Sequence, residues 1–272
     1  MHHQVVSTTQ IWEEAVQAIM HEGGEVPSRN GPTKELQGLL FPELDPTAPF
    51  IYTRGMSFKY ACGETLWYLM GSDRLHWIEK FAPSYGRFSD NGKTLNGAYG
   101  PKIRKGIPIV IAMLKQDPAT RRAVIPLYDM TNLGQDSKDI PCTLHLQFLI
   151  RGSKLFMMVH MRSNDLFLGF PYDVFAFSVI QCLIAKYLHI EVGTYAHFVA
   201  SGHLYVSDFK KLANTPLQTP PPDMPYHFVE DGVLHDISSQ YNDFEADATK
   251  LECGDTTIMP PIWRWLMEGA EL

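Results

Sequence analysis

Residues 175–188, FAFSVIQCLIAKYL, place the strongest constraint on the fold, because this stretch is apolar on nearly all faces of a helix. A helix with that pattern belongs inside a protein, where other elements cover it. Two strand-like segments lie just before it, at 142–150 and 154–161, and a short Arg-Gly-Ser connector joins them as a hairpin. The chain therefore needs a sheet and further helices around a central apolar helix.

The rest of the chain supplies both kinds of element. Helical spacing of apolar residues predicts helices, and apolar runs rich in β-branched and aromatic residues predict strands. Helices are expected at 8–22, 55–71 and 102–115, and further strands at 123–128 and 194–206. Loops are expected at 23–38 and 82–101, a proline-rich connector at 215–226, and short strand and loop after it. Strands interspersed with helices indicate one α/β (α+β) domain over residues 1–272.

The composition excludes several classes of protein. The formal net charge of −7 argues against a broad nucleic-acid-binding surface, which needs clustered Lys and Arg. The N-terminus lacks a basic segment followed by an apolar one, and no apolar run approaches the roughly 20 residues that span a bilayer. The four cysteines are far apart and match no metal-binding spacing, so free thiols in a reducing compartment are expected. We therefore expect a soluble cytoplasmic protein without a membrane or metal partner.

Cys142 follows Pro141 at the entry to a strand, downstream of a polar loop. A lone cysteine is most often a small buried hydrophobic residue, but a thiolate is a strong nucleophile where positive charge lowers its pKa. Candidate sources of that charge are Arg121, Arg122 and Arg162, which are also suited to capture a phosphate. The alternative for Arg121 and Arg122 is a solvated surface position. Together these residues are compatible with covalent catalysis on a small phosphorylated substrate.

A carboxylate, Glu64, stands in the middle of the apolar helix expected at 55–71. Burying a carboxylate is costly unless it is paired, hydrogen-bonded or protonated. Glu64 is therefore either part of a structural network or a tuned acid/base. Arg29 lies in a Gly- and Pro-rich loop, where a solvated arginine is the ordinary interpretation. His203 and Tyr205 are two residues apart and share one face of a strand.

Taken together, these motifs make the chain similar to the thymidylate synthase superfamily along most of its length. The resemblance rests on motifs that follow one another in the family's order: Arg29-Asn30-Gly31, Glu64-Thr65-Leu66-Trp67, Asn96-Gly97-Ala98-Tyr99-Gly100, Asp117-Pro118-Ala119-Thr120-Arg121-Arg122, Pro141-Cys142-Thr143 with Gln147, Arg162-Ser163-Asn164-Asp165, Leu168-Gly169-Phe170-Pro171-Tyr172-Asp173 and Ala200-Ser201-Gly202-His203-Leu204-Tyr205. The resemblance implies a three-layer fold with a mixed β-sheet. It also implies a homodimer that packs sheet against sheet and shares its active sites.

The resemblance implies a role for each motif. Cys142 would add to C6 of a pyrimidine, after which C5 takes a one-carbon unit from the cofactor 5,10-methylenetetrahydrofolate. Glu64 would act as general acid/base through water, and Tyr99 would assist proton removal from C5. Asp165 would bind the pterin of the folate. The nucleotide would be held by Arg29, Arg162, Ser163, Gln147, His203 and Tyr205, with Arg121 and Arg122 supplied by the second subunit.

Asp173 departs from the pattern of thymidylate synthases, in which this position is Asn. An amide matches O4 and N3–H of uracil, whereas Asp accepts from the amino group of cytosine and, if protonated, donates to N3. Thr143 replaces the usual His, and Ser201 replaces the usual Asp. These departures resemble the deoxycytidylate hydroxymethylases of phages with modified DNA. The resemblance then implies that dCMP is the substrate and that water captures the C5 methylene, giving 5-hydroxymethyl-dCMP and unoxidised folate.

Three alternatives stay open from the sequence. A dCMP methylase would keep the hydride step, although Tyr85 stands where ungapped counting places the cofactor-side Trp of thymidylate synthases. A CMP hydroxymethylase would act on the ribonucleotide. A catalytically silent relative would bind only a nucleotide or its own mRNA, but it would be expected to lose Cys142, Glu64 or Asp165, which are all present.

Overall fold

A seven-stranded mixed sheet is the framework of the computed structural model, which describes residues 7–214, 217–218, 221, 229–230, 233–234, 248–249 and 261–272. The strand order is β1-β2-β7-β5-β4-β3, and β6 pairs with β7. The pairs of β7 with β5 and with β6 are parallel, and the other pairs are antiparallel. The strands are β1 (Gly24–Val26), β2 (Thr33–Leu44), β3 (Val124–Pro126), β4 (Thr143–Arg151), β5 (Lys154–Met161), β6 (Asn164–Asp165) and β7 (Glu191–Tyr205).

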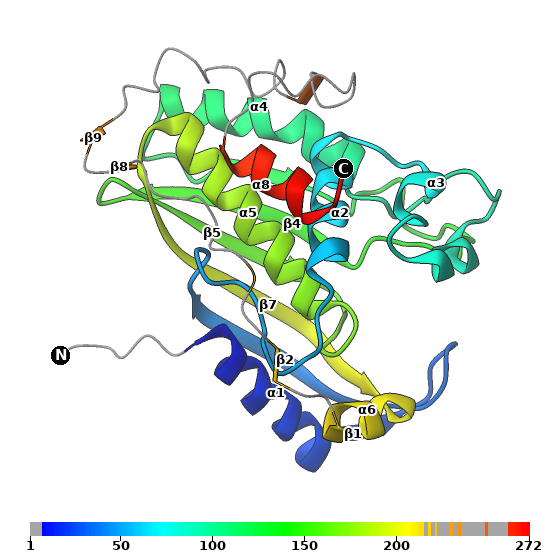
Figure 1. Ribbon diagram of the computed structural model, residues 1–272. Coiled ribbons are helices and arrows are strands. Elements are labelled where there is room, and N and C mark those ends of the chain that lie inside the picture. Colours follow the sequence, from blue (N-terminus) through cyan, green and yellow to red (C-terminus); the bar gives the residue numbers. More distant parts are fainter. Residues whose placement is uncertain are drawn as a thin grey trace.

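Helix α5 (Phe170–Leu188) lies at the centre of the core. Nearly all of its residues are buried, as the apolar pattern predicts. Figure 1 shows α5, α4 and α8 stacked over one face of the sheet. Helix α1 packs against β2 and β7. The helices whose full bounds lie within the described residues, with the short ones included, are α1 (Thr8–Glu22), α2 (Phe58–Leu69), α3 (Leu75–Ile78), η1 (Pro83–Phe88), α4 (Gly100–Gln116), α5, η2 (Val206–Asp208), α6 (Phe209–Asn214) and α8 (Pro261–Gly269).

Only one face of the sheet is fully buried. On β5, Leu155, Met157 and Val159 are completely buried, whereas the alternating residues are partly exposed. On that second face His145 and His160 stack with their ring centroids 4.6 Å apart. Leu40 of β2 is 60% exposed. The second face is therefore apolar and aromatic without full cover from the described part of the chain.

Most of the expected elements are confirmed, and the errors have physical reasons. The loop expected at 23–38 is wrong at Gly24–Val26, which form β1, and again beyond residue 32, because Thr33 begins the long strand β2. This segment alternates poorly and contains a Gly and a Pro, and it becomes a strand through its pairing with β7. The C-terminal residues 261–269 form α8 instead of strand or loop, since Ile262, Trp263 and Leu266 make a buried helical stripe.

Other expectations fall on short or undescribed segments. The strand expected at 123–128 is confirmed only as β3, and the loop expected at 82–101 contains the short helix η1. Residues 229–230 and 233–234 form a small hairpin, β8 (Val229–Glu230) with β9 (Val233–Leu234). The proline-rich connector at 215–226 lies mostly outside the described residues, as does Cys253. Cys62, Cys142 and Cys182 are free thiols, as expected. None of the described helices is long and apolar enough to cross a membrane.

Candidate active site

A cleft of about 810 Å³ brings most of the predicted functional residues together. Its walls come from the β1–β2 loop, α2, the loop before α4, the segment that enters β4, and the ends of β5 and β7. The predicted residues that line it are Arg29, Glu64, Tyr99, Cys142, Arg162, Ser163, Asp165, Asp173, His203 and Tyr205. A cleft of this size is in the range that holds small-molecule ligands.

Arg121, Arg122 and Gln147 do not line this cleft. Both arginines are exposed in the turn before β3, outside the regular strand. The side-chain amide of Gln147 donates to the carbonyl of Arg121 at 2.9 Å. Within one chain, Gln147 therefore positions the arginine turn and does not reach the cleft.

The thiol of Cys142 lies beside the guanidinium of Arg162. Arg162 Nη2 is 3.5 Å from Cys142 Sγ, and it also donates to the carbonyl of Ile140 at 2.9 Å. Arg162 Nε donates to the carbonyl of Pro141 at 2.9 Å. The arginine thus braces the two residues that precede the thiol and places positive charge next to the sulfur.

The expectation that arginines lower the pKa of Cys142 is only partly right. Burial raises the pKa of the Cys142 thiol above its ordinary value, and this effect outweighs the lowering by Arg162 and Arg29. The carboxyls of Asp173 and Asp139 raise it further. Arg121 and Arg122 make no such contribution here, since they lie outside the cleft. In the free chain the thiol is therefore mainly protonated, and attack requires a base to remove its proton.

Glu64 sits inside a cage of tyrosines. Its Oε1 accepts from the hydroxyl of Tyr60 at 2.6 Å and from that of Tyr85 at 3.0 Å. The two hydroxyls are 3.0 Å apart. Burial raises the pKa of Glu64, and the hydrogen bonds from the tyrosines, including Tyr68, oppose that rise. A buried carboxyl with a raised pKa and a hydroxyl relay is suited to general acid/base catalysis.

Asp173 lies in the first turn of α5 and is 9% exposed. Its Oδ2 accepts from the side-chain amide of Asn164 at 2.7 Å. Burial raises the pKa of Asp173 well above its usual range, and the nearby carboxyl of Glu64 raises it further, while the Asn164 hydrogen bond lowers it. When protonated, such a carboxyl has one acceptor oxygen and one donor hydroxyl.

Tyr99 and Asp165 are each tied to the backbone around the cleft. The hydroxyl of Tyr99 accepts from the backbone N–H of Thr143 at 3.2 Å, next to Cys142. Asp165 Oδ1 accepts from the N–H groups of Phe167 and Leu168 at 2.8 and 2.9 Å. These bonds oppose the rise in the pKa of Asp165 that burial causes. They orient the carboxyl and leave Asp165 Oδ2 for another donor.

One side of the cleft is formed by β7 and the β1–β2 loop. The rings of His203 and Tyr205 lie side by side with centroids 5.5 Å apart, so they share one face of the strand, as expected. The amide of Asn30 donates to the hydroxyl of Tyr205 at 3.4 Å, which places the loop carrying Arg29 beside Tyr205. Glu35 accepts from Ser201 at 2.5 Å. A carboxylate from β2 is therefore present where Ser201 replaces the family's Asp.

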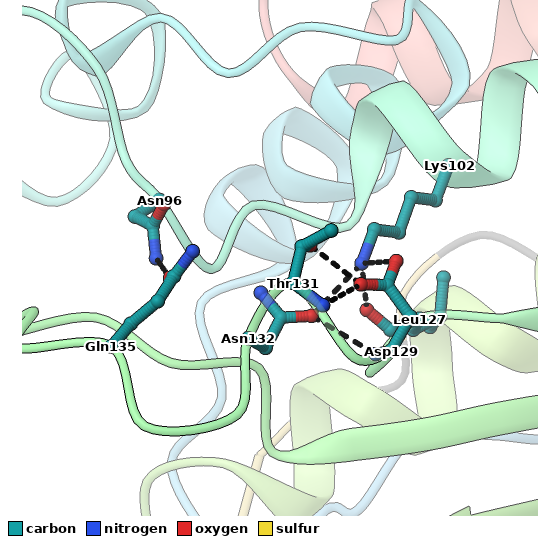
Figure 2. Close-up of polar contacts among 7 residues, drawn as sticks. All are labelled: Asn96, Lys102, Leu127, Asp129, Thr131, Asn132 and Gln135. Atoms are coloured by element: carbon teal, nitrogen blue, oxygen red, sulfur yellow. Dashed lines mark hydrogen bonds and ion pairs between the residues drawn. The ribbon is translucent and has the colours of Figure 1, made fainter.

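The loop that leads to Cys142 is fixed by polar contacts, some of which Figure 2 shows. Lys102 of α4 forms an ion pair with Asp129 at 2.8 Å and donates to the carbonyl of Leu127 at 2.6 Å and to Asn132 at 3.1 Å. Asn96 donates to Gln135 at 2.6 Å. The loop that holds the thiol is therefore anchored to α4 and to the segment before it.

Two candidate functional residues, Tyr60 and Asn164, were not predicted from the sequence. Tyr60 lies four residues before Glu64, which is the spacing at which side chains meet on a helix, so this signal was available. Asn164 had no such signal, because its contact with Asp173 depends on the turn between β6 and α5.

Comparison with known proteins agrees with the fold and the cleft. A sequence profile described as thymidylate synthase matches residues 10–252. The chain is 29% identical over 221 residues to a Bacillus phage SP01 protein named deoxyuridylate hydroxymethyltransferase, covering 74% of this chain and 58% of that protein. It is 32% identical over 216 residues to a Pseudomonas phage M6 protein of the same name, covering 74% of this chain and 60% of that protein.

The chain thus spans less than two thirds of the length of either relative. The profile, by contrast, covers most of the chain and includes each residue found in the cleft. The mixed sheet with helices is the α/β fold that the resemblance implied. On these grounds the chain belongs to the thymidylate synthase family.

Proposed function

We propose that this chain transfers a one-carbon unit from 5,10-methylenetetrahydrofolate to C5 of dCMP and releases 5-hydroxymethyl-dCMP. The observation that carries the proposal is one cleft that holds Cys142 beside Arg162 and also holds the buried Asp173, whose pKa is raised by burial. Cys142 beside Arg162 supplies a nucleophile, and Asp173 supplies hydrogen-bonding groups that can recognise a pyrimidine.

The residues of the cleft divide the work. Cys142 gives up its proton through water to Glu64, and its sulfur bonds to C6 as the C5–C6 π electrons shift toward C5. Asp173 stabilises the resulting charge by donating to N3 of the base. Tyr99 is hydrogen-bonded next to Cys142 and assists the removal of the C5 proton later in the cycle by orienting the water that carries it away. These are assigned roles for nucleophilic and general acid/base groups at hydrogen-bonding distances.

The cleft has groups that fit a folate. Asp165 is a largely buried carboxyl with one oxygen committed to backbone N–H groups, and its other oxygen suits the ring N–H groups of a pterin. When bound, the folate would supply the one-carbon unit. Leu168 and Phe88, which line the same cleft, offer apolar surface to a flat ring.

The polar cage around Glu64 favours water as the final reactant. Tyr85 donates to Glu64 and contacts Tyr60. An alignment without gaps from Tyr99 pairs Tyr85 with the cofactor-side Trp of thymidylate synthases, so a hydroxyl replaces an indole at this position. Hydroxyls with a carboxylate can hold and deprotonate a water, whereas an indole has no acceptor. The names of both phage relatives, which are hydroxymethyltransferases, also support this outcome over methylation.

The two candidate substrates, dCMP and dUMP, differ in their base. The carboxyl at position 173 favours dCMP by the donor and acceptor pattern of cytosine. The phage relatives are named for deoxyuridylate, and this favours dUMP as the second candidate. A mismatched buried pair costs about 1–3 kcal/mol per group, which corresponds to roughly tenfold to a hundredfold or more in discrimination.

A single assay tests the reaction and the base together. The chain is incubated with dCMP, dUMP or CMP and methylenetetrahydrofolate, and the product mass and the dihydrofolate absorbance are read in parallel. We expect a hydroxymethyl product from dCMP without dihydrofolate. Dihydrofolate formed in equal amount to product would contradict hydroxymethylation, and equal turnover of dUMP and dCMP would contradict the role of Asp173.

Two variants sharpen the assay. Cys142→Ser should abolish turnover, whereas Cys182→Ser, at a buried thiol outside the cleft, should keep it. Asp173→Asn should shift the preference toward dUMP. Equal loss of activity on both nucleotides would instead make Asp173 catalytic or structural.

The proposed enzyme works as a homodimer. Arg121 and Arg122 are exposed at the edge of the incompletely covered sheet face, and this is where a second copy would take them up as phosphate ligands. Stacked His145 and His160 and the exposed Leu40 offer that face the apolar and aromatic surface of an interface. Gln147 donates to the carbonyl of Arg121, so in the dimer it would help to place this arginine in the partner's site.

A further inference from the structure

Asn164 is a buried amide whose side chain serves no structural network that the structure describes. It is 3% exposed, begins β6 and lines the cleft. Its side-chain Nδ2 donates to Asp173 Oδ2, and among the described residues its Oδ1 is buried without a hydrogen-bond partner. Buried polar groups are normally satisfied, so an amide kept for one contact calls for an explanation.

That contact is held tightly in place. A methyl group on Gly169 would lie 3.0 Å from Asn164 Nδ2 and 3.4 Å from Asp173 Oδ2, so the backbone closes over the pair. The geometry leaves the two side chains little room to separate. The amide and the carboxyl therefore behave as one unit in the wall of the cleft.

The hydrogen bond gives the carboxyl a direction. An oxygen that accepts from an amide N–H acts best as the carbonyl oxygen of a protonated carboxyl, and the hydroxyl then falls on the other oxygen. Without the amide, the proton is free to sit on either oxygen. A carboxyl with a mobile proton matches cytosine in one form and uracil in the other, because the two bases exchange donor and acceptor at N3 and at position 4.

We propose that Asn164 is a positioning residue for base selection: by donating to Asp173 Oδ2 it keeps that oxygen an acceptor and fixes Oδ1 as the oxygen that donates to the pyrimidine. The inference rests on the proposed function, since it assumes that a pyrimidine nucleotide occupies the cleft. The proposal holds whichever base is preferred, because it concerns which oxygen of Asp173 carries the proton and not which base that arrangement favours.

Asn164→Leu tests the proposal, since leucine removes the amide at nearly constant size. We expect the ratio of kcat/KM for dCMP to kcat/KM for dUMP, measured in competition, to move toward unity by about tenfold or more. Asn164→Ser, which also loses the reach to Asp173, should give the same result if the leucine variant fails to fold. An equal fall in kcat/KM for both nucleotides would overturn the proposal.

The pH profile provides a second readout. The Asn164 hydrogen bond lowers the pKa of Asp173, so its removal should shift the alkaline limb of kcat/KM to higher pH. A merely structural Asn164 would leave that limb in place. Gln181→Met is the matched control, because Gln181 is also a buried amide with an unpartnered oxygen but lies on α5 outside the cleft. This variant should preserve both the ratio and the limb.

Calorimetric binding of dCMP and dUMP separates the two possible failures. Suppose that the chain turns over neither nucleotide but binds one of them more tightly, and that Asn164→Leu reduces this preference. That result would count against the proposed reaction and support the role of Asn164. Equal binding of both bases by the unaltered chain would overturn the role of Asn164, even if hydroxymethylation occurs.

Discussion

Arg162 Nη2 lies 3.5 Å from the sulfur of Cys142, while the same guanidinium holds the carbonyls of Ile140 and Pro141. One side chain therefore fixes the entry to β4 and supplies the charge nearest to the thiol. Because burial raises the pKa of Cys142 on balance, Arg162 moderates the cost of forming the thiolate without overcoming it.

Replacing Arg162 by Met should make the thiol less reactive. The loss of the largest lowering effect on the pKa of Cys142 should shift the pH dependence of its alkylation by iodoacetamide upward. At pH 8 we expect the rate to fall on the order of tenfold. Mass spectrometry of the peptide that contains Cys142 measures the rate without interference from other thiols. Arg162→Lys keeps the charge and should fall less, and an unchanged profile for Arg162→Met would contradict this account.

Glu64→Gln should stabilise the fold while it abolishes activity. Burial raises the pKa of Glu64, so the folded state binds its proton more tightly than the unfolded state and loses stability as the pH rises above the ordinary carboxyl value. Gln keeps the shape and removes the charge. We expect a Tm about 2–4 °C higher at pH 8, with a smaller difference at pH 5, and a loss of at least about a hundredfold in kcat. A lower Tm at pH 8 would show that the tyrosine cage outweighs the cost of burial.

Lys102→Met should loosen the loop that leads to the thiol. Hydrogen bonds from Lys102, the largest cause, and from Thr131 lower the pKa of Asp129 to about 2, and a carboxyl with a depressed pKa adds stability at higher pH that is lost as the pH falls toward that value. The variant should unfold at a lower temperature at pH 7, and the gap should close between about pH 4 and pH 2. Limited proteolysis should cut the variant faster within residues 127–139. Lys105→Met, at an exposed site on the same helix, is the control.

Mixing two inactive variants tests the shared sites of the proposed dimer. A chain with Arg121 and Arg122 both changed to Glu keeps its own thiol, and a Cys142→Ser chain keeps both arginines. Mixing equal amounts after unfolding and refolding should restore about a quarter of the activity, since half of the dimers are mixed and each has one intact site. No recovery, with mixed dimers shown by native mass spectrometry, would mean that each chain builds its site alone.

The sequence predicted the elements that carry their own local pattern. The apolar run of α5 and the hairpin of β4 and β5 were evident from periodicity and composition, and their positions are confirmed. The strand β2 was not, because its residues alternate weakly and gain their strand conformation from β7, with Thr33 paired to Tyr205. Long-range pairing of that kind leaves little trace in a local window.

The same division holds for the cleft. Cys142, Glu64 and Asp173 were named from motifs, and all three line one cavity. The sign of the net shift in the pKa of Cys142 was not foreseen, since burial is a property of the assembled walls. The contact of Asn164 with Asp173 was also missed, because it needs the turn that places β6 under the start of α5.

The pairing of β2 with β7 also determines when the cleft can form during synthesis and folding of the chain. Thr33 meets Tyr205 only after the chain between them has been made, and closing so long a loop is slow and entropically costly. A growing chain on the ribosome therefore cannot complete the cleft until β7 has emerged and joined the sheet. If the proposed function is right, nucleotide added during refolding should increase the yield of native protein by binding the closed sheet.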